Sequence, residues 1–232
     1  MANPFMAPTL PVELPDDPMT WAEAWLNEAI RRSVQRNPNT MTLATVAEDG
    51  QASARVVLCK AFVKDPGYVV FYTNYRSRKI VELRSNPKVA AMFHWDALGR
   101  QIRLEGTAVF SPSDESDTYF ASRDWGSQIG AWGSDQSYTL TSRQALKDQV
   151  LERAHELGVD VSDDLQSLTS DDRPNLSRPA HWGGIRLWPH TIELWIEGTD
   201  RIHDRASWRR SMSAAGDHDF VTGAWTGTRL QP

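Results

Sequence analysis

Two arginines flank a histidine and an aspartate in one short stretch near the end of the chain, the sequence RIHDR at residues 201–205. The formal net charge of the chain is −5, so this local excess of cations does not follow from the composition. If the stretch is a regular β-strand, alternation sends Arg201, His203 and Arg205 to one face. These side chains repel one another unless an anionic or electron-rich ligand lies over them. An exposed, charged strand without a ligand is the alternative.

A second pair of cations brackets an apolar strand, in the sequence RVVLCK from Arg55 to Lys60. Their separation of five residues places them on opposite faces of a regular strand. Either a bulge redirects one of them, or two ligand groups approach the strand from different sides. Charges on a solvated strand explain the pattern equally well.

A third cluster lies where a predicted strand runs into a predicted helix, with Tyr72 and Thr73 before the turn and Arg78 and Lys79 after it. A helix N-terminus presents unpaired N–H groups and a partial positive charge, which suits a phosphate. Basic residues in the first helical turn are unfavourable unless an anion is present. The sequence therefore favours a phosphate site here over a capped surface helix with basic residues.

The fourth cluster lies in YFASRDWGSQIGAW, which begins at Tyr119. If the helix expected over residues 113–123 continues through Arg123, that arginine shares a face with Tyr119, four residues earlier. Ser127 follows just beyond a glycine. A tyrosine, an arginine and a serine can together hold a second phosphate.

A β-rich framework must position these clusters. The run over residues 40–63 is broken by Asp49-Gly50, a strong hairpin signal, and with YVVFYTN it reads as three antiparallel strands in series. Further strands are expected in KVAAMFHW, RQIRLEGTAVF, GGIRLWP, TIELWIEG, DRIHDRASWRR and FVTGAWTGTRL. Helices are expected over residues 17–33, in SRKIVELRS, and over 113–123 and 142–157. These elements predict a mainly β (α+β) fold, an antiparallel barrel with helices packed outside.

The domain organisation is expected to be simple. Residues 1–16 carry four prolines and no periodicity, which predicts a flexible or surface-hugging arm. Residues 17–232 are expected to form a single domain. Residues 159–179 are polar and contain proline, and are expected to form a long loop.

Composition and motifs argue against several classes of protein. The N-terminus lacks the basic region and apolar run of a secretion signal, and no run of about 18 apolar residues is present, so we expect a cytoplasmic location without membrane contact. The mild acidity argues against a general nucleic-acid binder. One cysteine and six scattered histidines form no metal-binding motif, and no dinucleotide-binding or P-loop glycine pattern occurs, so no metal is expected.

The four clusters together resemble the pyridoxamine 5′-phosphate oxidase family, FMN-dependent enzymes that make pyridoxal phosphate. The matching stretches occur in family order: RVVLCK, FYTNYRSRK, RQIRLEG, YFASRDWGSQIGAW, DQS, WGGIRL, IELWIEGTDRIHDR and RLQP. The resemblance implies an antiparallel split β-barrel of the FMN-binding type, with peripheral helices. It also implies a homodimer with FMN at the subunit interface, and C-terminal strands that serve dimerisation and the active site.

The resemblance further implies roles for individual residues. It places FMN contacts on Arg55, Val56, Val57, Leu58, Cys59, Lys60, Tyr72, Thr73, Arg78, Lys79, Gln101, Gln136, Ser137, Trp195 and Arg205. It places the phosphate and ring of the substrate on Lys60, Tyr119, Arg123, Ser127, Arg201 and His203. Of these, Arg201 and His203 are expected beside the reacting carbon.

The implied reaction is oxidation of pyridoxamine 5′-phosphate or pyridoxine 5′-phosphate to pyridoxal 5′-phosphate, with dioxygen as acceptor and hydrogen peroxide as product. Two alternatives stay open: a split-barrel flavin oxidase of the phenazine-pathway type, and a flavin- or pyridoxal phosphate-binding module with little turnover. The chain departs from the family pattern at the N-terminal arm, which lacks arginine, tyrosine and glycine, and at Asp124. Proline is usual at that position, and here an acid follows Arg123.

Overall fold

The structure is a computed structural model that describes residues 8–159 and 175–232. The chain divides into two compact units. The first comprises Met1–Phe71, Glu82–Phe110 and Ile185–Pro232, and the second comprises Tyr72–Val81 and Ser111–Gly184. The single domain expected over residues 17–232 stays a prediction. The arm and the long loop expected over 1–16 and 159–179 lie partly outside the described residues.

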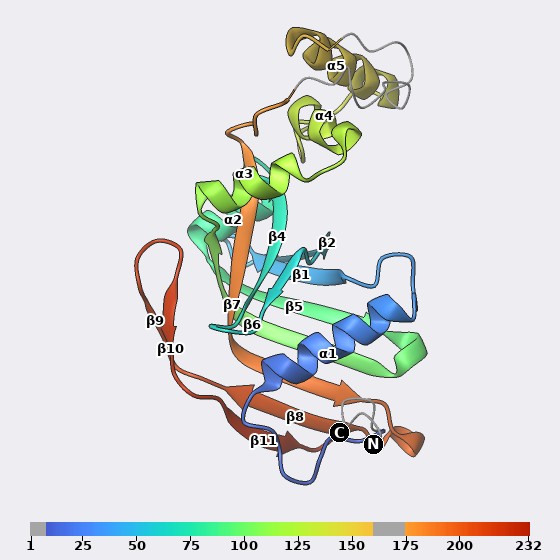
Figure 1. Cartoon of the computed structure of the whole chain (residues 1–232), viewed down its shortest axis with the longest axis vertical. Helices are drawn as coiled ribbons and strands as arrows, with labels where there is room; N and C mark the ends of the chain where they lie inside the picture. Colours follow the sequence, from blue (N-terminus) through green and yellow to red (C-terminus); the bar gives the residue numbers. More distant parts are fainter. Residues whose placement is uncertain (1–7, 160–174) are drawn as a thin grey trace. The chain divides into compact units, whose positions relative to one another are not determined.

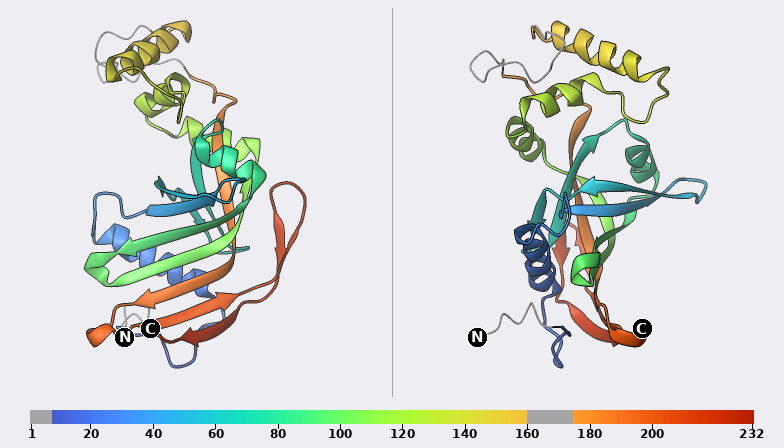
Figure 2. Two further views of the ribbon diagram at one scale, coloured as in Figure 1. Left: turned by 180° about the vertical axis from the view of Figure 1, so that it is seen from behind. Right: turned by 90° about the vertical axis from the view of Figure 1, so that its right-hand side faces the viewer.

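A curled antiparallel sheet dominates the structure (Figures 1 and 2). In the described part of the chain it has nine strands, in the order β11-β8-β7-β6-β5-β1-β2, with β3 and β4 off this path. The strands are β1 (Thr40–Val46), β2 (Ala52–Leu58), β3 (Ala61–Val63), β4 (Tyr68–Asn74), β5 (Lys88–Trp95), β6 (Arg100–Phe110), β7 (Trp182–Ile196), β8 (Asp204–Arg209) and β11 (Thr226–Leu230). β9 (Met212–Ala214) and β10 (Phe220–Thr222) form a separate two-stranded sheet. The predicted mainly β, antiparallel fold class is confirmed.

Alternating side chains along the central strands build the core of the first unit. In β5 and β6 every second residue is buried, and Phe93, Ile102 and Leu104 are fully enclosed. This period of two is the one that a sheet with one face on a core requires. β1 and β2 form the expected hairpin, with Gly50 in the left-handed conformation at the turn.

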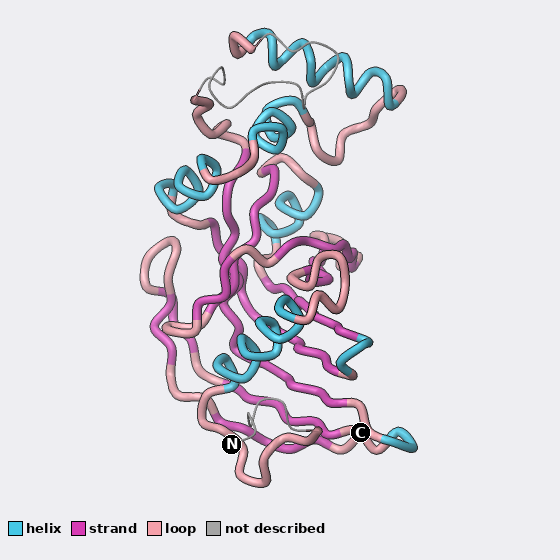
Figure 3. The backbone as a smooth tube through the Cα atoms, turned by 45° about the vertical axis from the view of Figure 1, so that its right-hand side comes forward, coloured by secondary structure: helices cyan, strands magenta, loops and turns pink. Residues whose placement is uncertain are grey.

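Helix α1 (Pro18–Arg31) crosses one face of this sheet (Figures 1 and 3). Asp17 caps it by accepting hydrogen bonds from the backbone N–H groups of Met19 and Thr20, as its place before a proline predicts. The buried carboxylate of Glu28 lies 2.6 Å from the Arg100 guanidinium at the start of β6. The predicted first helix is confirmed.

Three strand predictions are wrong. The strand expected in FVTGAWTGTRL is two strands, β10 and β11, which belong to different sheets. The run from residue 52 to 63 breaks at Cys59 and Lys60, so β2 pairs with β1 while β3 pairs with β4, and the three strands are not in series. In contrast, the two strands expected in GGIRLWP and TIELWIEG are one, β7, of 15 residues. A register shift opposite Glu105 and Gly106 allows this, because a bulge accommodates a residue such as Pro189 that lacks a backbone donor.

The prediction that RIHDR lies in a single strand is also wrong. β7 and β8 pair from Ile196 and Asp204 onward, so the residues between them must reverse the chain. Asp200 and Arg201 take left-handed backbone conformations in a short 3₁₀ turn, with φ angles of 54° and 65°. Consequently Asp204 and Arg205 lie at the start of β8, whereas Arg201 and His203 belong to the connection.

The described helices of the second unit enclose a core of their own. They are α3 (Ser113–Ala121), α4 (Trp125–Gly133) and α5 (Arg143–Glu156), and α2 (Arg78–Ser85) begins in this unit. Phe120, Trp125, Ile129 and Trp182 are buried together. α4 was not predicted, and α3 ends at Ala121, so the assumption that its helix continues through Arg123 is wrong. None of the described helices is long and apolar enough to cross a membrane.

Candidate functional site

A buried ammonium group lies at the start of α2 in the second unit. Lys79 is only 7% exposed. Its Nζ donates hydrogen bonds of 3.0 Å each to Thr73 Oγ1, Ser77 Oγ and Gln136 Oε1. Three predicted cofactor residues, Thr73, Lys79 and Gln136, are therefore brought together around one positive charge.

The neighbours of this ammonium group follow from local structure. Arg78 is exposed at the first position of α2, where the free N–H groups of a helix lie. Ser137 follows Gln136 with a φ angle of 76°, which is unusual for a residue other than glycine. Such outliers are concentrated at ligand sites, which agrees with the cofactor role predicted for Ser137.

A stack of aromatic rings lies in the same unit. The ring centroids of Tyr72 and Tyr119 are 3.8 Å apart, and those of Tyr72 and Trp182 are 5.5 Å apart. The guanidinium of Arg123 lies over Trp182, 4.5 Å from its ring centroid. Burial lowers the pKa of Arg123, whereas Tyr119 and Asp124 favour its charged form. Tyr119 and Arg123 are thus brought together, although not by sharing a helix.

The third predicted phosphate ligand, Ser127, lies in the first turn of α4. Asp124 caps this helix, and its Oδ1 accepts a hydrogen bond from the backbone N–H of Ser127 at 2.8 Å. The bonds from Ser127 lower the pKa of Asp124, and the charge of Arg123 adds to this effect. An ionised carboxylate therefore already occupies a donor of the predicted phosphate site.

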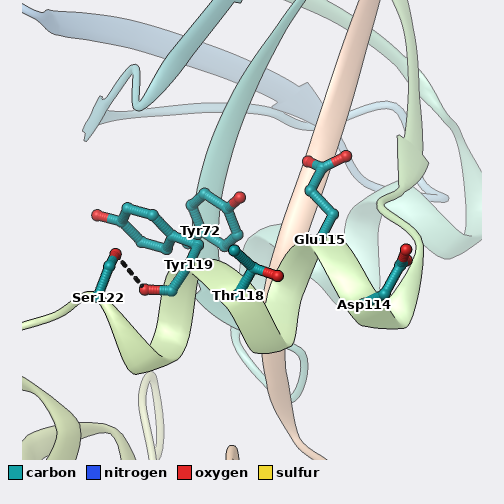
Figure 4. A pocket seen from close by; sticks show the side chains of 6 residues that line it. All are labelled: Tyr72, Asp114, Glu115, Thr118, Tyr119 and Ser122. Carbon is teal, nitrogen blue, oxygen red and sulfur yellow. Dashed lines mark hydrogen bonds between the residues drawn. The ribbon is translucent and has the colours of Figure 1, made fainter.

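A pocket of about 340 Å³ opens beside the paired tyrosine rings (Figure 4). It is lined by Tyr72, Asp114, Glu115, Thr118, Tyr119 and Ser122. Figure 4 shows Tyr72 and Tyr119 side by side, with Asp114, Glu115 and Thr118 along α3 and Ser122 just after its end. The hydroxyl of Ser122 donates to the backbone carbonyl of Tyr119 at 2.8 Å, which ties the end of α3 to the pocket wall.

In the first unit, Arg55 lies in a polar network across β1 and β2. Its Nη2 is 3.1 Å from the carboxylate of Glu82, a residue that is itself only 4% exposed. It also donates to the hydroxyls of Thr45 and Ser53, and Ser53 in turn donates to Glu82. The arginine is therefore held in place by an acid that sequence reasoning did not single out.

The strand break after β2 answers the question raised by the spacing of Arg55 and Lys60. β2 ends at Leu58, so the two cations do not share a regular strand, and the alternation that would place them on opposite faces does not extend to Lys60. That two ligand groups meet Arg55 and Lys60 stays a prediction. Cys59 is buried at the break and its Sγ donates to the carbonyl of Ala61. Lys60 is exposed, whereas Val57 and Leu58 are half-buried. Val56 is exposed.

Three more predicted cofactor residues form a row across neighbouring strands. Gln101 of β6 pairs with Trp195 of β7, and Trp195 pairs with Arg205 of β8. The ring of His203 lies 4.7 Å from that of Trp195, and His203 Nδ1 accepts a 3.2 Å hydrogen bond from the backbone N–H of Gly198. Arg201 is exposed in the preceding turn.

The carboxylate of Glu193 holds the end of this row. Arg205 donates to it through Nε and Nη2. Glu193 was missed by sequence reasoning, although one signal was present: an acid between apolar residues in a buried strand. Such an acid requires a cationic partner.

The predicted site residues are distributed over both units. The first unit contains Arg55, Val56, Val57, Leu58, Cys59, Lys60, Gln101, Trp195, Arg201, His203 and Arg205, and the second contains Tyr72, Thr73, Arg78, Lys79, Tyr119, Arg123, Ser127, Gln136 and Ser137. Within the described ranges, no group of three or more His, Cys, Asp or Glu side chains is arranged to hold a metal ion.

The half-barrel, with polar residues in register across β6, β7 and β8, defines a protein of the split-barrel class. Residues 26–155 match the family described as Pyridoxamine 5′-phosphate oxidase. Residues 182–232 match the region described as Pyridoxine 5′-phosphate oxidase C-terminal dimerisation region. The chain belongs to the pyridoxamine 5′-phosphate oxidase family, and the resemblance noted from its motifs is confirmed.

Similar proteins cover nearly the whole chain. It is 43% identical to a pyridoxine/pyridoxamine 5′-phosphate oxidase of Burkholderia vietnamiensis, over 93% of this chain and 89% of the relative. It is 42% identical to the protein of the same name from Cupriavidus necator, over 88% of this chain and 87% of the relative.

Two solved structures resemble the fold. PhzG from Burkholderia lata 383, in complex with tetrahydrophenazine-1-carboxylic acid, is 29% identical with a TM-score of 0.76, covering 97% of this chain and all of PhzG. A pyridoxamine 5′-phosphate oxidase-related, FMN binding protein from Nostoc punctiforme has a TM-score of 0.64, covering 91% of this chain and 97% of its own. At 14% identity, it shows the fold alone.

Proposed function

We propose that the protein is an FMN-dependent oxidase that converts pyridoxamine 5′-phosphate or pyridoxine 5′-phosphate to pyridoxal 5′-phosphate, with dioxygen as acceptor. Family membership and the names of the 43% and 42% identical relatives support this reaction. One observation carries the proposal. The second unit holds two separate cationic groups, Lys79 with its hydroxyl and amide partners and Arg123 beside Tyr119, and the reaction needs one phosphate site for FMN and one for the substrate.

FMN is the cofactor, and its phosphate fits the residues around Lys79. An ammonium group held among the oxygens of Thr73, Ser77 and Gln136 presents a fixed positive charge with its rotamer already ordered. Arg78, at the first position of α2, adds a second positive charge, and the helix N-terminus adds N–H donors. Riboflavin lacks the phosphate that these groups would bind.

The row of Gln101, Trp195 and Arg205 is proposed to contact the flavin ring. Trp195 offers a flat apolar face and Gln101 an amide donor and acceptor. Bound FMN supplies the hydride acceptor of the reaction. The Arg205 guanidinium is held by Glu193. Beside bound FMN it would supply a positive charge to the flavin ring.

The substrate phosphate is assigned to Lys60, Tyr119, Arg123 and Ser127. Arg123 and Ser127 flank Asp124 in sequence, and Tyr119 lies close enough to Arg123 to influence its pKa. His203 and Arg201 are assigned to the reacting end of the substrate, because His203 lies against Trp195 and Arg201 is exposed in the adjoining turn. Holding both ends of the substrate would orient its reacting carbon, and such positioning lowers the barrier of the reaction.

The protein is proposed to act as a homodimer, which the match of residues 182–232 to a dimerisation region supports. A role in vitamin B6 metabolism follows from the proposed reaction. The cytoplasmic location stays a prediction.

A second candidate function is oxidation of a phenazine-type substrate. The similarity to PhzG at a TM-score of 0.76 favours it, because PhzG was solved with tetrahydrophenazine-1-carboxylic acid. The presence of Lys60, Tyr119, Arg123 and Ser127 together favours a phosphorylated pyridine instead.

Release of hydrogen peroxide distinguishes these functions. The FMN-loaded protein is mixed with pyridoxamine 5′-phosphate, pyridoxine 5′-phosphate, unphosphorylated pyridoxine, or tetrahydrophenazine-1-carboxylic acid. We expect rapid peroxide release with the two phosphorylated compounds only. Turnover of the phenazine compound alone would establish the second candidate, and a flavin-loaded protein that releases no peroxide with any of them would be a binding module.

A further inference from the structure

Asp124 lies between two residues assigned to the substrate phosphate, Arg123 and Ser127. It is the N-cap of α4, a helix of nine residues, and its Oδ1 accepts a 2.8 Å hydrogen bond from the backbone N–H of Ser127. Free N–H groups at a helix N-terminus are the donors that a bound anion uses. The protein thus supplies its own anion at this position.

Arg123 has a guanidinium nitrogen that could donate to a bound anion. Its Nη1 is buried and makes no hydrogen bond to any residue of the described part of the chain. Its guanidinium is positioned by the face of Trp182 rather than by a carboxylate. The carboxylate of Asp124 is instead directed to Ser127. Beside Arg123, Ser127 and the other residues assigned to the phosphate, a ligand at this subsite therefore also meets one fixed negative charge.

The negative charge on Asp124 is present under ordinary conditions. Hydrogen bonds from the hydroxyl and the backbone N–H of Ser127 hold the pKa of Asp124 below its usual value, with Arg123 contributing. The side chain is exposed, so salt in the solvent screens its charge.

We propose that Asp124 determines the charge selectivity of this subsite, by occupying the Ser127 donor and repelling a second negative charge. The subsite then binds a phosphate dianion less tightly, relative to a singly charged anion such as a carboxylate, than it would with a neutral residue at position 124. This inference rests on the proposed function, which places the substrate phosphate on Arg123 and Ser127.

Asp124→Asn removes the negative charge of residue 124 and keeps the N-cap hydrogen bond. The amide oxygen of asparagine can still accept the hydrogen bond from Ser127, and asparagine is as good an N-cap as aspartate. Repulsion between a dianion and a nearby solvated carboxylate predicts that the variant binds phosphate about three- to tenfold more tightly at low ionic strength. The gain should shrink as salt is added.

The experiment measures the affinity of the FMN-loaded protein for inorganic phosphate at pH 8, where phosphate is mainly a dianion, and for acetate, a singly charged anion. Phosphate affinity is expected to rise about three- to tenfold in Asp124→Asn, while acetate affinity changes less. Asp148→Asn is the matched control, because it removes the same charge from α5, where Asp148 accepts a hydrogen bond only from Gln144 among the described contacts. Asp124→Ser, a second neutral cap, replaces the first variant if that one fails to fold.

Equal phosphate affinity in wild type and both Asp124 variants would overturn the inference, as would an equal gain in Asp148→Asn. Different outcomes would contradict the proposed oxidase function and the inference about Asp124. If the wild type releases no peroxide from pyridoxine 5′-phosphate but Asp124→Asn still tightens phosphate binding, the function is wrong and the inference stands. Turnover by the wild type with unchanged phosphate affinity in the variants refutes the inference alone.

Discussion

Arg205 donates two hydrogen bonds to one oxygen of Glu193, from Nε at 3.1 Å and from Nη2 at 3.0 Å. Glu193 is only 2% exposed, and Arg103 Nη2 lies 2.8 Å from its other oxygen, as an ion pair without hydrogen-bond geometry. A buried carboxylate between two guanidinium groups restricts the rotamers of Arg205. The residue assigned to the flavin is thus positioned by contacts between β6, β7 and β8.

Glu193→Gln should weaken FMN binding and lower stability. The substitution leaves two arginines beside a neutral amide. Because these arginines are 25% and 40% exposed, the loss should be smaller than the roughly 3–5 kcal/mol typical of a fully buried pair. Urea denaturation and flavin content of the purified protein measure the two effects. Glu105→Gln is the control, since Glu105 contacts the same Arg103 but is 41% exposed. Equal losses in both variants would contradict the positioning role.

Lys79→Gln should remove the preference for FMN over riboflavin. The wild type is expected to bind FMN more tightly than riboflavin, because only FMN offers a phosphate. The ammonium group can redirect to it one of the three hydrogen bonds that it donates to Thr73, Ser77 and Gln136. A charge-assisted hydrogen bond contributes roughly 1.5–3 kcal/mol, so the variant should bind FMN about 10- to 150-fold more weakly, with little change for riboflavin. Fluorescence titration with both flavins tests this, with the exposed Lys147→Gln as control. Comparable wild-type affinity for the two flavins would refute the assignment.

Arg123→Ala should weaken the substrate and spare the cofactor. Loss of a charge-assisted hydrogen bond predicts that KM for pyridoxine 5′-phosphate rises about 10- to 150-fold. Steady-state kinetics give the KM of the variant, and flavin content measured in parallel shows whether FMN is retained. A variant that loses FMN but keeps its KM would show that the two phosphate sites have been assigned the wrong way round.

Arg201→Leu should give a folded, flavin-loaded protein whose kcat/KM falls at least about tenfold, which corresponds to roughly 1.4 kcal/mol of transition-state stabilisation. The variant keeps much of the side-chain bulk but loses the charge. Asp204→Asn is the comparison, because Asp204 accepts from Leu10 N and Arg229 Nη1, a structural role, so stability should fall more than kcat. Normal turnover by a fully loaded Arg201→Leu protein would leave Arg201 as a solvated surface residue.

Cys59 should resist thiol reagents in the folded protein. Burial raises the pKa of its thiol to about 12. The reactive thiolate forms only as the pH rises through the pKa, so the native thiol stays protonated at pH 8. Reaction with a disulfide reagent should occur at pH 8 only after denaturation. Rapid labelling of the native protein would show that β2 and β3 open readily.

Local chemistry made much of the fold predictable. Asp17-Pro18 and Asp49-Gly50 act through their own backbone and side-chain geometry, so the first helix and the first hairpin follow from a few residues. The clusters at Lys79 and Arg123 were singled out from near neighbours in the sequence, Thr73 and Tyr119. The structure adds contacts from distant segments, Gln136 to Lys79 and Trp182 to Arg123.

The errors arise where distant contacts decide the structure. α4 contains Gly126, Gly130 and Gly133, which disfavour a helix, yet burial of Trp125 and Ile129 outweighs that cost. At Gly133 a Cβ atom would lie 2.7 Å from Val150, so glycine is what allows α4 to approach α5. Glu193 was missed because its partners lie on β6 and β8, which no local pattern reveals.

The place of β7 in the sheet has a consequence for biosynthesis. β7 pairs with β6 on one side and β8 on the other, but its first residue is Trp182. During synthesis of the chain, β6 therefore cannot pair with β7 until most of the sequence has been translated. Throughout that interval Ile102 and Leu104 belong to a strand with an open edge, which can pair with another nascent chain. Premature termination before β7 should therefore yield aggregates rather than a smaller folded protein, and chaperone capacity should limit the yield during rapid expression.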